Sequence, residues 1–117
     1  MYLGDTANNK KQLYHIYNEV SKQILGVGTL SLKIVVDDDT IIFRAKHRRA
    51  QRSIILEQES PHLKNKVDYQ LSNIFKTCVK EKLEKTMGLH VEAILRDYDS
   101  KTQLAFTIVV LNDNQIQ

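Results

Sequence analysis

The sequence predicts an α+β fold: a two-layer domain of order α-ββ-(short α)-α-ββ, with an antiparallel four-stranded sheet packed by helices. Three observations support this class. The 117 residues have the composition of one globular domain, with 42% hydrophobic and 26% charged residues. Two segments show helical spacing of apolar residues, and four short segments alternate as strands do. Only one connection between strands is long enough for a helical crossover, which argues against a parallel sheet.

The first predicted helix covers residues 9–25. Its apolar residues recur at steps of three and four, the spacing of one helix face: Leu13, Ile16, Tyr17, Val20 and Ile24. The segment Gly26-Val27-Gly28 ends the helix, because glycine adopts the left-handed conformation without a Cβ penalty. The polar residues 1–8 are predicted to form a disordered tail.

A β-hairpin is predicted next, from residues 30–36 and 40–45. Both segments alternate, and the first face of each is apolar: Leu32, Ile34 and Val36, then Ile41, Phe43 and Ala45. Asp37-Asp38-Asp39 joins them, and aspartate side chains satisfy the backbone groups of a turn. Residues 50–58 are ambiguous and fit one or two helical turns.

The long helix is predicted to start at Ser60-Pro61 and to end at Gly88. Serine can cap the free N–H groups, and proline suits the first helical position. The apolar stripe consists of Leu63, Val67, Leu71, Ile74 and Cys78, with Phe75 and Val79 beside it, and then Leu83 and Met87. These steps of three and four persist for about seven turns.

A second hairpin is predicted from residues 89–96 and 103–111, around a turn at residues 97–102. Val91, Ala93 and Leu95 share one face of the first strand, and Leu104, Phe106, Ile108 and Val110 share one face of the second. The single domain is therefore expected to span residues 9–111. Residues 112–117 are expected to be a polar C-terminal tail.

Residue types that carry out catalysis or bind metals are present but have no informative spacing. Cys78 lies on the apolar stripe, where a free cysteine behaves as a small hydrophobe. No two of His15, His47, His62 and His90 have the spacing of a helical zinc site. Asp37-Asp38-Asp39, and likewise Asp97, Asp99 and Thr102, have the chemistry of turns. We expect no enzyme, cofactor or metal site, although a site assembled from His47, His62 or His90 stays open.

The strongest departure from average composition is a basic segment at residues 44–52. It contains Arg44, Lys46, Arg48, Arg49 and Arg52, and these five charges exceed the net charge of +3 for the whole chain. Concentrated positive charge attracts the phosphates of nucleic acid or of an anionic membrane surface, or an acidic protein partner. The alternative is a solvated connector whose arginines pair with Glu57 or Glu59.

Several short segments resemble the MpsC-like family, a component of a Na⁺-translocating membrane potential-generating system. They are Gly26-Val27-Gly28-Thr29, residues 39–43, Met87-Gly88-Leu89-His90-Val91, and residues 97–102 with the strand to Leu111. The order of these segments carries the resemblance. The chain departs from the family pattern at residues 26–29 and in the basic segment, so it resembles a divergent member.

The resemblance implies a non-catalytic accessory or regulatory domain. Such a domain would dock on the cytoplasmic side of a membrane system for cation or inorganic-carbon transport, as a homo-oligomer. The location expected is cytoplasmic, either free or peripheral to the inner face of the membrane, because the chain shows neither a secretory signal nor an apolar run of about 20 residues. The alternative function is a nucleic-acid-binding module that uses the basic segment.

Overall fold

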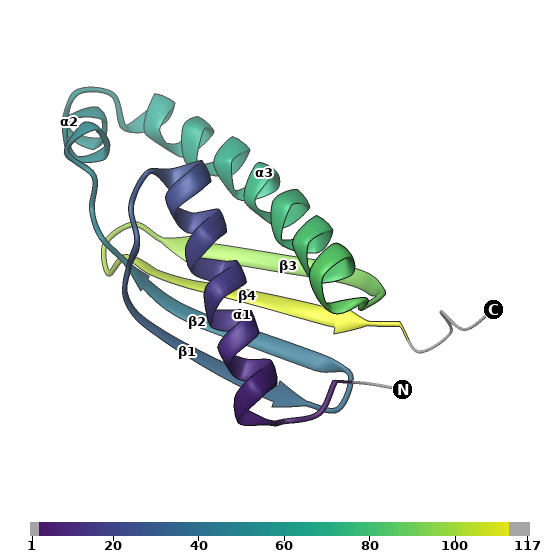
Figure 1. Ribbon diagram of the computed structural model, residues 1–117. Helices are drawn as coiled ribbons and strands as arrows, with labels where there is room; N and C mark the ends of the chain where they lie inside the picture. The colour runs from purple at the N-terminus through teal and green to yellow at the C-terminus, as the bar shows by residue number, and fades with distance from the viewer. Residues whose placement is uncertain (1–2, 113–117) are drawn as a thin grey trace.

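The computed structural model describes residues 3–112 and has two layers, shown in Figure 1. One layer is a four-stranded antiparallel sheet of order β1-β2-β4-β3, and α1 and α3 lie side by side across one of its faces. The strands are β1 (Thr29–Asp37), β2 (Thr40–His47), β3 (Val91–Asp99) and β4 (Leu104–Leu111). The predicted fold class and element order are confirmed. The segment at residues 50–58, which is ambiguous in the sequence, forms the helix α2 (Gln51–Glu59). This helix projects beyond the end of the sheet (Figure 1).

The first helix begins earlier and ends differently from the prediction. α1 (Ala7–Val20) starts two residues before the expected position, because Thr6 Oγ1 accepts a hydrogen bond from the Asn9 backbone N–H at 3.1 Å. Residues 7 and 8, assigned to the tail from the sequence, are therefore helical. After Val20 the chain continues as the π-helical turn η1 (Ser21–Leu25), which ends at left-handed Gly26.

The long helix α3 (Pro61–Met87) has the predicted ends, but its N-terminal cap and its buried face differ from the prediction. Ser60 makes no side-chain capping hydrogen bond. Its buried face is the line of Phe75, Val79 and Leu83, whereas Ile74 is 47% exposed. Leu83 is thus buried as predicted, but in the middle of α3 the buried line is displaced by one residue, from Ile74 and Cys78 to Phe75 and Val79. α3 is also joined to α1 by the hydrogen bond of 2.7 Å from Lys82 Nζ to Glu19 Oε1.

Gly88 ends α3 in the left-handed conformation, with φ of +65°. Replacing Gly88 with alanine is expected to lower the free energy of unfolding by about 1 kcal/mol, since an L side chain strains this conformation. Gly28→Ala is the matched control, because its Cβ would meet Lys22 Cε at an ordinary 3.7 Å. Urea denaturation measures both, and an equal effect of the two substitutions would contradict the prediction.

A bulge in β3 determines which side chains of the second hairpin face the helices. The register with β4 shifts between Val91 and Ala93. Val91 is therefore buried while Ala93 and Leu95 point outward, so the predicted common face is wrong. Ala105, Thr107, Val109 and Leu111 form the buried face of β4. The larger apolar side chains of β4, grouped correctly from the sequence, lie on the opposite face of the sheet.

Candidate functional site

Between the helices and the sheet lies a cluster of polar side chains. Tyr17, Ser21 and Thr107 are fully buried, and His47 is only 3% exposed. His47 is the last residue of β2 and continues the inward alternation of that strand, while Thr107 does the same on β4. Arg96 reaches the cluster from β3, where the bulge turns it inward. Five elements, α1, η1, β2, β3 and β4, therefore contribute side chains to one polar centre.

The hydrogen bonds of this cluster form a directed chain. Ser21 Oγ donates to the Val27 carbonyl at 2.8 Å, so it accepts from His47 Nδ1–H at 3.3 Å. His47 Nε2 then carries no proton and accepts from the Tyr17 hydroxyl at 2.9 Å. Tyr17 Oη in turn accepts from Arg96 Nη1 at 3.0 Å. The chain fixes His47 as the neutral Nδ1–H tautomer.

Burial and the nearby charge act on the titration of the cluster. Burial, together with the smaller effect of the nearby Arg96 guanidinium, lowers the pKa of His47 to about 4. Burial also raises the pKa of Tyr17, against the opposing effect of Arg96. Both groups are therefore neutral at physiological pH, and Arg96 supplies the only charge of the cluster.

Arg96 is held by neutral groups alone. Its Nη1 donates to Tyr17 Oη and, at 2.8 Å, to Thr107 Oγ1, and its guanidinium lies 3.9 Å from the centre of the Phe75 ring. The Nε atom is buried and has no hydrogen-bond partner, and no carboxylate within residues 3–112 forms an ion pair with Arg96. This positive charge therefore lacks a counter-charge.

A cavity of about 70 Å³ adjoins this guanidinium. Its lining includes His47, Arg96, Ser72 and Tyr98, together with Arg48 from the basic segment. Asp68 is the one acidic residue in the lining, and it is paired with the buried Lys64 one helical turn away. The net charge around the cavity is therefore positive, and the arrangement can bind an anionic group.

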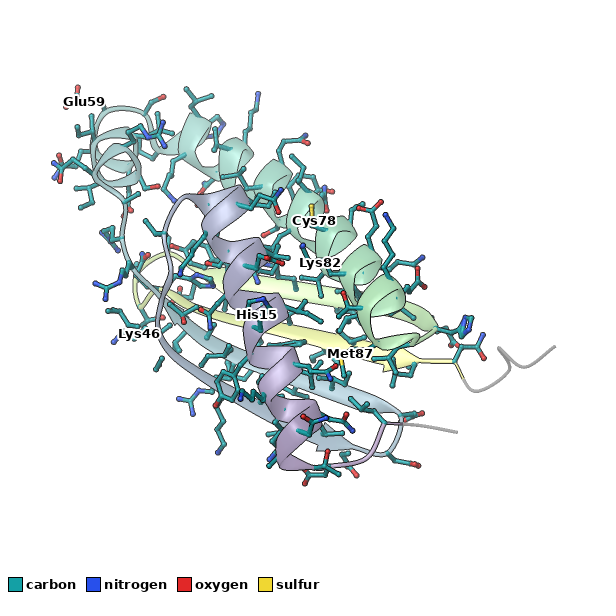
Figure 2. All side chains as sticks on the ribbon, in the orientation of Figure 1. His15, Lys46, Glu59, Cys78, Lys82 and Met87 are labelled. Carbon is teal, nitrogen blue, oxygen red and sulfur yellow. The ribbon has the colours of Figure 1, made fainter. Side chains whose placement is uncertain are left out.

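The basic segment is divided between two surfaces. Arg44 and Lys46 are exposed on the face of the sheet opposite the helices, and Figure 2 shows Lys46 at the edge of the molecule, away from α1 and α3. Arg48 lines the cavity, and Arg52 is exposed on α2. Arg49 Nη2 donates to the Ser100 carbonyl at 2.6 Å, and Arg49 Nη1 lies 3.7 Å from Glu57 Oε1. This ion pair is what a solvated connector predicts.

The other candidates from the sequence lie apart from this centre. His15, His62 and His90 are exposed, and Cys78 is half-buried against the core. Asp37, Asp38 and Asp39 lie at the turn of the first hairpin. Asp97 and Asp99, predicted in the second turn, lie instead in β3, which extends to Asp99, and Asp99 accepts from Thr102 in the turn. In the part of the chain that the structure describes, no group of three metal-ligating side chains gathers.

Sequence reasoning missed Arg96, Tyr17, Ser21 and Thr107. One signal was available: His47 occupies the inward phase set by Ile41, Phe43 and Ala45, so it belongs to the core rather than to the basic surface. Arg96 had no such signal, because the β3 bulge reverses the phase of its strand.

Comparisons with known proteins do not identify a function for this site. None of the helices within residues 3–112 combines the length and apolarity needed to cross a bilayer. A comparison with protein families, curated proteins and solved structures finds no match to this chain.

Proposed function

We propose that the chain is a non-catalytic accessory or regulatory domain that binds an acidic group of a partner at the cavity between Arg48 and Arg96. One observation carries the proposal: a half-buried guanidinium that has no ion-pair partner within residues 3–112 lines the same cavity as an arginine of the basic segment. Removing a charge from water without a partner is costly. An oxyanion in the cavity would supply charge-assisted hydrogen bonds to both arginines.

The size of the cavity limits what can bind there. A volume of about 70 Å³ holds a few water molecules, hence one carboxylate or phosphate group rather than a nucleotide. The cluster behind it does not suit a general base, since Nε2 and Nδ1 of His47 are both engaged in hydrogen bonds. The groups of the site therefore suit binding of an anion better than its conversion.

The resemblance to the MpsC-like family supports the setting of the proposal. In that setting the partner is a component of a membrane system for cation or inorganic-carbon transport, and the domain docks on its cytoplasmic side. An exposed aspartate or glutamate of that component would enter the cavity. The exposed Arg52 on α2 would attract this acidic group as the partner approaches.

Recovery of partners from native membranes tests the proposal. The tagged chain should retain a membrane protein, and Arg48→Glu/Arg52→Glu should reduce its recovery at least tenfold. Arg49 is left unchanged because it joins the β3–β4 turn to α2. Lys11→Glu/Lys80→Glu makes the same charge change at exposed helix positions and should leave recovery intact. Equal recovery by all three proteins would contradict the proposal.

A nucleic-acid-binding module is the second candidate, because the structure brings an exposed aromatic ring to the basic segment. Phe106 is 44% exposed on the outer face, and the Arg44 guanidinium carbon lies 6.0 Å from its ring centre. Aromatic rings beside basic residues on a sheet face can stack bases. This function predicts binding of single-stranded oligonucleotides that weakens steeply with salt and is lost in Phe106→Ala. Failure to bind at low salt would end it.

A further inference from the structure

The face of the sheet opposite the helices, here called the outer face, has an apolar centre and is not covered by any element within residues 3–112. α1 and α3 lie only on the inner face (Figure 1). The register places Val35, Ile42, Ile108 and Leu95 in one row straight across the four strands. Leu95 is 57% exposed, and Phe106 in the adjacent row is 44% exposed. Uncovered apolar patches of this kind mark interaction surfaces.

Charges on the outer face are segregated by strand. In the row next to the apolar one, Lys33 and Arg44 lie on β1 and β2, and Asp97 lies on β3 beyond Phe106. In the following row, Lys46 on β2 is matched by Asp99 on β3. In these two rows one side of the face is therefore basic and the opposite side is acidic, whereas on the other side of the apolar row β1 carries Asp37.

We propose that the outer face binds the outer face of a second copy of this chain, around a two-fold axis parallel to the strands. This rotation keeps every row but reverses the order of the strands, so β1 faces β3 of the second copy. Ile42 then meets Ile108, and Lys33 meets Asp97, each twice by symmetry. The result is a β-sandwich, with two sheets about 10 Å apart.

The alternative two-fold axis across the strands fits less well. It would keep each strand over its own copy but exchange the rows. With the axis between the two rows Lys33 would face Val35, and with the axis on the apolar row Lys33 would face Asp37 but Asp97 would face Ala93 and be left without a partner. The strand spacing and rise give the outer face about 500 Å² per copy, hence about 1,000 Å² in total. This area reaches the lower limit for a specific interface. Charge complementarity and area thus favour a second copy as the occupant.

Sedimentation of the full chain over a range of concentrations tests the interface. The unmodified chain should form a dimer, and Leu95→Lys should raise the dissociation constant at least a hundredfold, because it buries an unpaired charge. Leu63→Lys on α3, where the side chain is 48% exposed, is the control and should remain dimeric. A monomeric unmodified chain, or loss of the dimer in Leu63→Lys but not in Leu95→Lys, would overturn the proposal.

Charge exchange tests the two-fold axis itself. Lys33→Asp and Asp97→Lys should each weaken the dimer about tenfold, since each places like charges in two symmetric contacts. Mixing the two variants should restore a heterodimer, and Lys33→Asp/Asp97→Lys in one chain should restore the homodimer. No restoration in either case would exclude this axis. Arg48→Glu/Arg52→Glu should stay dimeric, which separates this test from that of the proposed function. A monomer that binds oligonucleotides through Phe106 would instead assign the outer face to nucleic acid.

Discussion

Phe75→Ala is expected to lower the free energy of unfolding by about 4 kcal/mol, the largest effect of any single substitution discussed for this chain. Phe75 is fully buried at the centre of the helix–sheet interface. Its ring lies 5.1 Å from the Tyr17 ring and 6.5 Å from the His47 ring, between centres. It also supports the Arg96 guanidinium, so its loss leaves both an apolar cavity and a less well-held charge. Urea denaturation measures the change.

Ile74→Ala is the matched control for this prediction. Ile74 is the adjacent residue on α3, lies on the stripe predicted from the sequence, and is 47% exposed. Its truncation should cost less than about 1 kcal/mol, since little apolar surface returns to water. A larger loss in Ile74→Ala than in Phe75→Ala would mean that α3 buries the predicted stripe after all.

Acidification from pH 7 to pH 4 is expected to remove about 3 kcal/mol of stability through His47 alone. The pKa of His47 is about 4 in the folded chain because of burial and Arg96, against 6.5 for an ordinary histidine. Between these values the unfolded chain binds more protons than the folded one, so stability falls by about 1.4 kcal/mol for each pH unit. The contribution is complete above pH 6.5, and the loss levels off below pH 4.

Urea denaturation at a series of pH values measures this loss. His47→Gln keeps a donor and an acceptor but does not titrate, so its stability should depend less on pH between 4 and 6.5. Carboxylates contribute at the acid end in both proteins, so the difference between the two curves isolates His47. His62→Gln, at an exposed position of α3, is the control and should keep the steeper dependence. Parallel curves for His47→Gln and the unmodified chain would contradict the expected titration.

Elements defined by local spacing could be predicted from the sequence, and their packing faces in part. The predicted inward and outward faces of the first hairpin are correct, because its register follows from a short turn and strict alternation. The long helix was correct in extent, since Pro61 and Gly88 mark its ends. Its buried face was displaced by one residue because two adjacent apolar lines compete, and only the shape of the sheet selects between them.

The polar centre could not be predicted, for a different reason. Arg96 lies inward only because a bulge after Val91 shifts the phase of β3, and alternation alone assigns it to solvent. The concentration of basic residues at 44–52 predicts a single surface patch. Alternation along β2 instead places Arg44 and Lys46 on the outer face and His47 in the core. Arg48, which follows β2, and Arg96, on β3, line one cavity only because the antiparallel sheet brings distant segments together, and local sequence carries no sign of this.

The resonance of Arg96 Nε–H tests the central claim most directly, because this donor is buried and lacks a partner. Arg96→Lys identifies the signal in a ¹H–¹⁵N spectrum by its loss. Titration with acetate or phosphate should shift the signal and reach saturation, and Arg48→Gln should need a higher anion concentration for the same shift. Chloride at matched ionic strength is the control for screening. If acetate and phosphate move the signal no more than chloride does, the cavity between Arg48 and Arg96 is not an oxyanion site.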